Sequence, residues 1–203
     1  MIENISIRQA TIEDAEALLK IYTPYILNTA ITFETDVPTV EAFKERIQNI
    51  TAQYPYLTAT VDNEIVGYAY AHEFSERTAY KYSAEVTIYI NANMRHFGLG
   101  KKLYIILEEV LKAQGILNIY SCVACPDVED EYLTNNSRDF HLHLGYEIVG
   151  KFNKCGYKFN RWYNMLYMEK ILGEHNENTP KFTKFKDLPA SLFNKLGIRG
   201  AIC

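Results

Sequence analysis

The run Arg95–Lys102 combines two glycines with several cations, and this combination is suited to binding phosphate. It reads RHFGLGKK and joins a strand-like segment, residues 86–90, to an amphipathic segment that ends near Gly115. At such a junction the free N–H groups of a helix start point at an anion, glycine lets the anion approach, and the helix dipole favours negative charge. The sequence therefore predicts a phosphate-binding loop.

Two common phosphate loops do not fit this run. A dinucleotide fingerprint needs a third glycine where this chain has Leu103, and a nucleoside-triphosphate loop needs four residues between its glycines. The pattern that remains, R-x-x-G-x-G, resembles the acetyl-CoA pyrophosphate loop of the GNAT acetyltransferase superfamily. A Gly-x-Gly turn before a helix is common by itself, so the interpretation depends on the surrounding elements.

Hydrophobic periodicity predicts the elements that hold this loop. Strands are expected at Ile5–Gln9, Tyr56–Val61, Ile65–Tyr70, Lys81–Ile90, Ile116–Cys125, Glu147–Phe152 and Tyr163–Lys170. Helices are expected from Thr11 to Pro24, from Pro38-Thr39 onward, from the glycine loop to Gly115, and from Asn136-Ser137 to Gly145. The order β-α-α-β-β-β-α-β-α-β-β predicts an α/β (α+β) protein with a mixed sheet flanked by helices.

Composition limits the class of protein. The chain has 203 residues, 48% hydrophobic and 23% charged, which is ordinary for a soluble globular protein. A net charge of −4 gives no support for nucleic-acid binding, and no apolar stretch is long enough to span a membrane. We see no signal peptide, and four cysteines do not indicate a disulfide scaffold, so we expect a cytoplasmic protein. The composition becomes polar beyond Leu172, which predicts a domain at 1–172 and an extension at 173–203, with a short helix at Ala190–Leu196.

Motifs in the second half narrow the resemblance. In order along the chain they are Ala79-Tyr80, Ala84-Glu85, the glycine loop, Ser137–His141, Leu144–Tyr146, Gly156–Lys158 and Arg161–Tyr163. Over residues 5–170 the chain resembles the phosphinothricin N-acetyltransferase-like branch of GNAT. The resemblance implies the GNAT fold, with a mostly antiparallel sheet, and acetyl transfer from acetyl-CoA to the primary amine of a small molecule, an amino acid or analogue. It also implies direct attack in a ternary complex, a homodimer, and no metal.

The resemblance assigns cofactor contacts to three segments. The strand Ile88, Tyr89, Ile90 would supply backbone amides to the pantetheine arm, with the Ile88 amide also holding the oxyanion. The pyrophosphate would contact the loop residues Arg95, His96, Phe97, Gly98, Leu99, Gly100 and Lys101. Asn136 and Ser137 would contact the CoA arm. The branch carries an asparagine three residues before Ser137, where this chain has Thr134, so Asn135 or Asn136 is the candidate replacement.

Two residues are candidates for proton transfer. Glu85 matches the general base of the family, which removes the proton that an amine carries at neutral pH. A carboxylate there could also anchor the ammonium group, or simply face solvent on its strand. His141 occupies the position of a tyrosine that protonates the CoA thiolate in many GNAT enzymes, and imidazole can act as acid or base near pH 7. A packing role for His141 stays open, and we interpret His143 as structural.

The acceptor side departs from the branch. Phe33, Arg77 and Tyr80 match residues that line the amine pocket, which in this branch lies near a dimer interface. The expected lysine is replaced by Ser75, and the arginine expected after Phe33 is replaced by Glu34. Because two cations are lost, we expect phosphinothricin, a doubly anionic amine, to be a poor substrate.

Two other functions were considered. Cys122 and Cys125 form a C-x-x-C pair that could bind zinc with Cys155, His141 or His143, or could be redox-active. Their odd spacing on a strand places the two thiols on opposite sides of the sheet, which disfavours both roles. A non-catalytic CoA-binding sensor or interaction module of GNAT fold is the alternative to an enzyme, and the presence of Glu85 argues against it.

Overall fold

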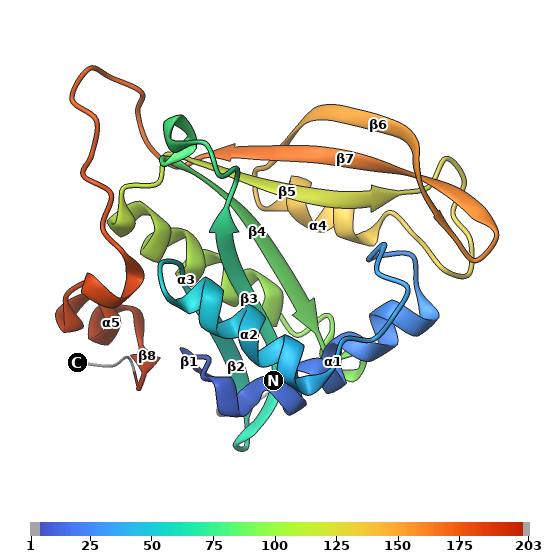
Figure 1. The fold of residues 1–203 in the computed structure, drawn as a ribbon, viewed down its shortest axis with the longest axis horizontal. Coiled ribbons are helices and arrows are strands. Elements are labelled where there is room, and N and C mark those ends of the chain that lie inside the picture. Colours follow the sequence, from blue (N-terminus) through green and yellow to red (C-terminus); the bar gives the residue numbers. More distant parts are fainter. Residues whose placement is uncertain (1–4, 201–203) are drawn as a thin grey trace.

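A computed structural model of the chain describes residues 5–200, which form one eight-stranded sheet flanked by helices (Figure 1). The strands are β1 (Ile5–Gln9), β2 (Tyr56–Val61), β3 (Glu64–Glu73), β4 (Ser83–Ile90), β5 (Asn118–Cys125), β6 (Glu147–Lys158), β7 (Arg161–Ile171) and β8 (Ile198–Arg199). The helices are α1 (Ala15–Asn28), α2 (Val40–Thr51), α3 (Leu99–Gln114), α4 (Asn136–His143) and α5 (Ala190–Leu196).

The strand order is β6-β7-β5-β4-β3-β2-β1-β8, and the pairs are antiparallel except for β4–β5 and β1–β8. The predicted mixed, mostly antiparallel sheet is thus confirmed. The β4–β5 pair covers only the register from Ser83↔Asn118 to Glu85↔Tyr120. Beyond Glu85 the two strands diverge, and Figure 1 shows the resulting V.

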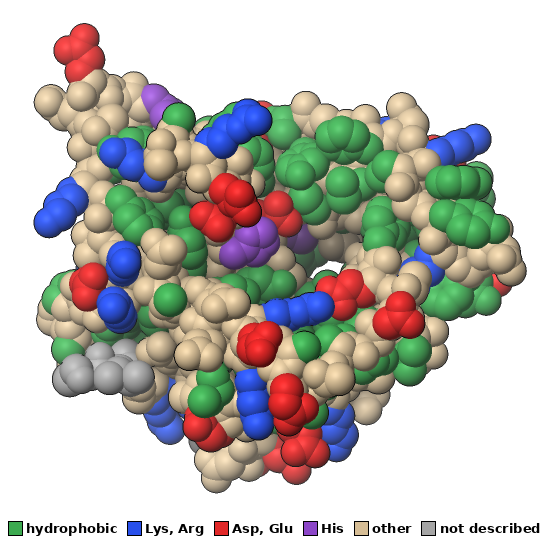
Figure 2. Space-filling view, in the orientation of Figure 1, with side chains coloured by type: hydrophobic (Ala, Val, Ile, Leu, Met, Phe, Trp, Pro, Cys, Tyr) green, Lys and Arg blue, Asp and Glu red, His purple; other side chains and the backbone are tan. Residues whose placement is uncertain are grey.

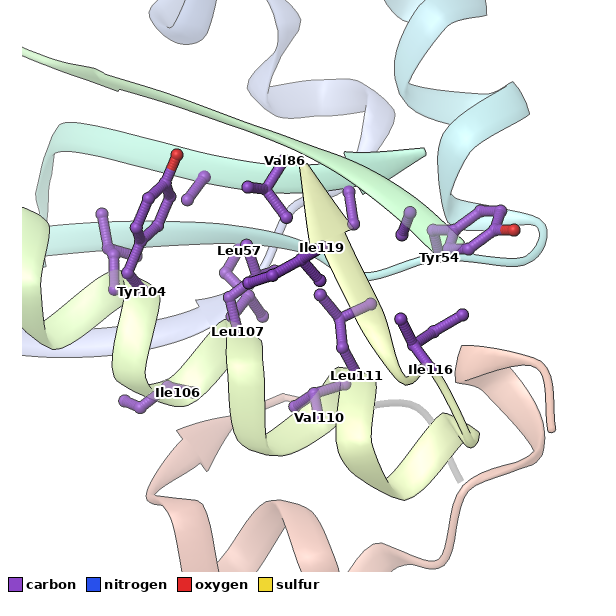
Figure 3. Packing of buried hydrophobic residues seen from close by; sticks show 14 of the residues in the cluster. Tyr54, Leu57, Val86, Tyr104, Ile106, Leu107, Val110, Leu111, Ile116 and Ile119 are labelled. Carbon is purple, nitrogen blue, oxygen red and sulfur yellow. The ribbon is translucent and has the colours of Figure 1, made fainter. Parts of the chain in front are cut away.

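Alternation along the strands gives the sheet two different faces. On β3, Tyr68 packs with the buried side chains of α1 and α2, while Ala69 and Ala71 belong to the core under α3. Figure 3 shows that second core, in which Leu107 and Leu111 of α3 point toward the sheet. The helix predicted after the glycine loop therefore packs on the sheet face opposite α1 and α2.

The prediction that Pro24 ends the first helix is wrong, because α1 continues to Asn28. Proline removes the N–H that would bond the carbonyl of Lys20. Both residues lie on the exposed side of the helix, where water can bond that carbonyl, while Tyr25 and Ile26 beyond the proline are buried. The packing of the last turn of α1 therefore stabilises the helix by more than the lost hydrogen bond at Pro24 destabilises it.

The β6–β7 hairpin is longer than predicted, because β6 continues past Phe152 and β7 begins before Tyr163. Its turn is Phe159-Asn160, with φ of +51° and +59°, a left-handed pair that matches the twist of a two-residue hairpin. The register of β6 shifts between Phe152 and Gly156, where the Asn164 side chain accepts a hydrogen bond from the Lys154 amide. The long hairpin extends the part of the sheet formed by β5, β7 and β6, on the far side of the gap between β4 and β5.

Residues 173–200 fold back onto the sheet rather than away from it. Phe185, Phe193 and Ile198 join the core under α3, and β8 adds a strand beside β1. The buried Gln114 side chain donates to the carbonyls of Gln53 and Thr183 and so ties this segment to the body. The short helix predicted at Ala190–Leu196 is confirmed. Among the described residues, no helix combines the length and apolar character needed to cross a membrane.

We predict that Phe185→Ala destabilises the protein strongly, because the ring is 1% exposed and its loss leaves a cavity in the main core. The expected loss in free energy of unfolding is about 3–5 kcal/mol. Urea denaturation measures it, and Val128→Ala, at a position 81% exposed, is the control with an expected change under about 0.5 kcal/mol. Equal stability of the two variants would show that residues 173–200 do not contribute to the core.

Candidate active site

The divergence of β4 from β5 opens a cavity of about 290 Å³. Six of the residues predicted for the site line it: Phe33, Glu85, Ile88, Tyr89, Ser137 and His141. They come from the loop after α1, from β4 and from α4. Figure 2 shows a hollow near the centre of this face, bordered by histidine, acidic and basic side chains. The structure therefore brings the predicted catalytic pair and part of the cofactor strand into one space.

Ile90 and the loop residues 95–101 lie outside this cavity, and so do Arg77, Tyr80 and Asn136. Arg77 and Tyr80 are exposed at a short helix, Thr78–Tyr80, with the Tyr80 ring against Phe74. Asn136 is exposed at the start of α4, one residue before Ser137. The structure therefore does not place Arg77, Tyr80 or Asn136 with the catalytic pair.

Phe33 is held in the cavity wall by a glycine on β6. A Cβ atom at Gly156 would lie 2.4 Å from the Phe33 ring, so only glycine accepts the ring there. The preceding backbone is anchored as well, since the buried Lys158 ammonium donates to the Thr32 carbonyl at 2.8 Å. Burial lowers the pKa of Lys158. The Gly-Tyr-Lys motif of residues 156–158 thus positions one wall of the site.

The backbone of β4 presents amides to the V. The Asn91 N–H donates to the Val66 carbonyl on the β3 side. Because N–H groups alternate along an antiparallel strand, the amides of Ile88 and Ile90 point away from β3, toward the space that β5 has left. The Tyr25 hydroxyl accepts from the Ile90 amide and donates to the Ile90 carbonyl. A ligand contact at Ile90 therefore has to displace Tyr25, whereas Ile88 lines the open cavity.

The glycine loop ends at the start of α3 as predicted. Gly98 has φ of +77°, a left-handed conformation that favours glycine, and no side chain of residues 5–200 caps the first N–H groups of the helix. Arg95 and Lys101 are exposed and make no ion pair with any residue between 5 and 200. Free amides beside unpaired cations fit a pyrophosphate group.

Gly100 has a packing role that the sequence did not show. A Cβ atom there would lie 3.2 Å from the Phe140 ring of α4. The second glycine of the loop therefore lets α3 and α4 approach each other. That approach brings His141 of α4 beside Tyr104 of α3, at a ring-centroid distance of 5.5 Å.

Glu85 lies between two partners. It pairs across the strands with His72, whose Nε2 is 3.8 Å from Glu85 Oε1, while the His72 Nδ1 bonds the Glu73 carbonyl. On its other side is the Cys122 thiol of β5. Burial, together with the Glu85 carboxylate, raises the pKa of Cys122 to about 12. The thiol therefore stays protonated at neutral pH and is a weak nucleophile.

His141 is 3% exposed and hydrogen-bonded at both ring nitrogens. Its Nδ1 lies 2.7 Å from the Ser137 carbonyl, which can only accept, so Nδ1 carries the proton. Its Nε2 lies 3.2 Å from the Tyr104 hydroxyl and must accept from it. Burial lowers the pKa of His141 to about 4. The imidazole is therefore neutral at pH 7 and has no second proton to donate.

Further cavity residues were not predicted from the sequence. They include Tyr70, His72, Thr87, Tyr104, Ser121 and Cys122. Strand alternation could have indicated Thr87, which shares a face with Glu85, and His72, which lies opposite it. Tyr104 carried no such signal, because it belongs to the apolar stripe of α3.

The C-x-x-C pair does not form a metal site in the described part of the chain. Cys122 faces the cavity, Cys125 is buried, and both thiols are free. Among residues 5–200 no group of three or more His, Cys, Asp or Glu side chains is placed to hold a metal ion.

Comparison with known proteins agrees with this geometry. Residues 7–167 match the family described as Acetyltransferase (GNAT) domain. The phosphinothricin N-acetyltransferase of Streptomyces viridochromogenes is 28% identical over 166 residues, which cover 82% of this chain and 87% of that protein. An L-methionine sulfoximine/L-methionine sulfone acetyltransferase of Pseudomonas aeruginosa is 29% identical over 166 residues, or 81% of this chain and 92% of that protein.

Comparison with solved structures also gives an acetyltransferase. The phosphinothricin acetyltransferase of Sinorhizobium meliloti, crystallised with acetyl-CoA, superposes with a TM-score of 0.78 at 28% identity. The match covers 91% of this chain and 99% of that one. The diverging strands, the glycine loop and the family match together show that the protein belongs to the GNAT family of acetyltransferases.

Proposed function

We propose that the protein transfers an acetyl group from acetyl-CoA to the primary amine of a small molecule, an amino acid or analogue, by direct attack in a ternary complex. One observation carries the proposal: the Glu85 carboxylate and the Ile88 residue, whose amide faces the V, line the same cavity. A proton acceptor and an oxyanion donor on one strand are what aminolysis of a thioester requires. The names of the relatives, which acetylate amino-acid analogues, support the acceptor class.

The residues present fit acetyl-CoA along a continuous path. The amides at the start of α3, with Arg95 and Lys101, would hold the pyrophosphate, and His96, Phe97, Gly98, Leu99 and Gly100 complete that loop. The β4 backbone at Ile88, Tyr89 and Ile90 would hold the pantetheine arm. Ser137, which lines the cavity, would face the arm from α4, and exposed Asn136 would contact it nearer the surface.

Glu85 manages the proton of the amine. It takes one proton from the ammonium group, directly or through water, which frees the nitrogen lone pair. The new C–N bond forms as the C–S bond breaks, and the second proton lost by nitrogen balances the charge of the departing thiolate. His72, 3.8 Å from Glu85, orients the carboxylate. Phe33 packs beside the amine, and Arg77 and Tyr80 lie further out, toward the surface.

His141 acts through Tyr104 rather than as an acid. Because neutral His141 accepts from the Tyr104 hydroxyl, it fixes the position of that hydroxyl over the cavity that both residues line. The Tyr104 proton is engaged in this bond, so the departing thiolate takes its proton from the amine nitrogen. The protonated Cys122 supports direct attack over an acyl-enzyme. The free thiols of Cys122 and Cys125 suit a reducing compartment, and we propose the cytoplasm as the location.

The long β6–β7 hairpin supports the proposed homodimer. Val149, Phe152, Tyr157 and Trp162 on this hairpin are each at least half exposed. Three of them lie on β6, the edge strand of the sheet, where exposed apolar side chains often mark an interface. We propose that a second copy covers this surface.

We predict that Glu85→Gln lowers kcat for amine acetylation by about 10²–10⁴-fold, because an amide cannot accept the proton. Affinity for acetyl-CoA, measured by calorimetry, should stay unchanged. Thiol release measured across an amine panel gives the rates. Wild-type protein that binds acetyl-CoA but acetylates no amine would instead support the non-catalytic sensor, and full activity of the variant would remove Glu85 from the mechanism.

His141 gives the protein a pH-dependent stability. Its pKa is near 4 in the folded protein and about 6.5 in the unfolded chain, so only the unfolded chain gains a proton between these values. Stability therefore falls as the pH falls through this window. Between pH 7 and pH 5 the wild type should lose roughly 2 kcal/mol more than His141→Gln in urea denaturation. Parallel curves for the two proteins would contradict a neutral, buried His141.

We predict that Val149→Asp converts a dimer into a monomer, because a carboxylate buried in an apolar interface is strongly unfavourable. Sedimentation equilibrium measures the mass. Ile105→Asp, at an exposed apolar residue on α3, is the matched control and should remain a dimer. A wild-type protein that is monomeric at all concentrations would refute the proposed homodimer.

A further inference from the structure

A second cavity, of about 330 Å³, lies beside the first one, under α2. It shares Tyr70, His72 and Tyr89 with the catalytic cavity, so the two spaces adjoin. We call it the tyrosine chamber after the five tyrosines that line it: Tyr22, Tyr56, Tyr68, Tyr70 and Tyr89. None of the roles assigned above uses this space.

Strand register explains why the chamber leads to Glu85. His72 lies opposite Glu85, Tyr68 opposite Tyr89, and Tyr70 opposite Tyr56. Since partners across a strand pair project on the same side of the sheet, these side chains form one row on the face beneath α1 and α2. Glu85 and His72 stand at one end, Tyr70 and Tyr56 lie two residues further along their strands, and Tyr68 and Tyr89 stand at the other end.

The aromatic rings of this row lie close to one another. The ring centroids of His72 and Tyr70 are 6.1 Å apart, those of Tyr70 and Tyr56 are 4.7 Å apart, and those of Tyr56 and Tyr68 are 5.6 Å apart. Aromatic rings therefore line the chamber from the side of Glu85 to its inner end. An extended molecule with its nitrogen at Glu85 can lay its other end along these rings.

Two hydroxyl groups at the inner end have no partner within residues 5–200. Tyr56 and Tyr68 are each 1% exposed, and neither hydroxyl makes a hydrogen bond there. Tyr22 differs, because its hydroxyl bonds Thr32 at 2.8 Å. Burial raises the pKa of both Tyr56 and Tyr68, so both keep their protons. Both residues line the chamber, so each hydroxyl can donate its proton to a ligand oxygen that enters it.

The charge balance of the chamber favours an uncharged group there. Arg46 is the cation that lines the chamber, and its guanidinium bonds both carboxylate oxygens of Glu34, at 2.8 and 3.5 Å. The arginine is already neutralised, so it offers little to a carboxylate or phosphinate. Glu34 stands where the resemblance predicts an arginine. In this chain it binds Arg46 instead.

We propose that the tyrosine chamber binds the far end of the acceptor amine, and that this end is an uncharged aromatic or apolar group that carries a hydrogen-bonding oxygen. The nitrogen lies at Glu85, the body of the molecule packs along Tyr70, and the oxygen bonds the hydroxyls of Tyr56 and Tyr68. This subsite rests on the proposed function, because it requires the amine to react beside Glu85.

The test uses two amines that differ by one oxygen atom, tyramine and phenethylamine. The wild type should favour tyramine in kcat/KM by about tenfold, since each neutral hydrogen bond contributes roughly a two- to tenfold effect. Tyr56→Phe and Tyr68→Phe each remove one hydroxyl and keep the ring. Each should lower the ratio of the two kcat/KM values by roughly two- to tenfold, with most of the change in KM for tyramine.

Tyr54→Phe is the matched control. Tyr54 is 8% exposed, lies two residues before β2 and belongs to the core on the other face, so loss of its hydroxyl should leave the ratio at the wild-type value. A wild-type ratio near one, or an equal ratio in all four proteins, would overturn the subsite while leaving acetyl transfer intact. If no amine is acetylated by any of the proteins, the proposed function itself is wrong and the subsite is rejected with it.

Discussion

The separation of β4 from β5 is the constraint on which the site depends. Two parallel strands that pair for three residues and then part leave backbone amides of β4 without a strand partner. Everything chemical in the protein is arranged around that gap: Glu85 at its closed end, α4 across it, and the glycine loop where β4 gives way to α3. A continuous β4–β5 ladder would satisfy these amides and close the cavity.

The same strands serve two purposes because their side chains alternate. One face of β2–β4 carries small and branched apolar groups that pack on α3 in the larger core (Figure 3). The other face carries groups with polar tips, from Glu85 through His72 to the tyrosines, under α1 and α2. The groups proposed to contact the acceptor thus share one face of the sheet, and the opposite face is apolar.

Local pattern was enough to predict most of the elements and the loop, because each depends on neighbouring residues. It failed at Pro24, where buried residues further along the helix decide the outcome. It could not find Tyr104, since a tyrosine in an apolar stripe gives no sign that its hydroxyl meets His141. It also could not foresee that Gly156 holds Phe33, because residues 123 positions apart in sequence meet only in the fold.

The Tyr25 hydroxyl imitates a missing strand at Ile90, since it donates to the carbonyl and accepts from the amide as a neighbouring peptide would. A ligand arm that takes this place exchanges one pair of hydrogen bonds for another. Its gain there is therefore small, while α1 loses a tether to the sheet. If the donor arm binds at Ile90 as proposed, its binding would free Tyr25 and would alter the contact of α1 with β4, beside the space proposed for the acceptor.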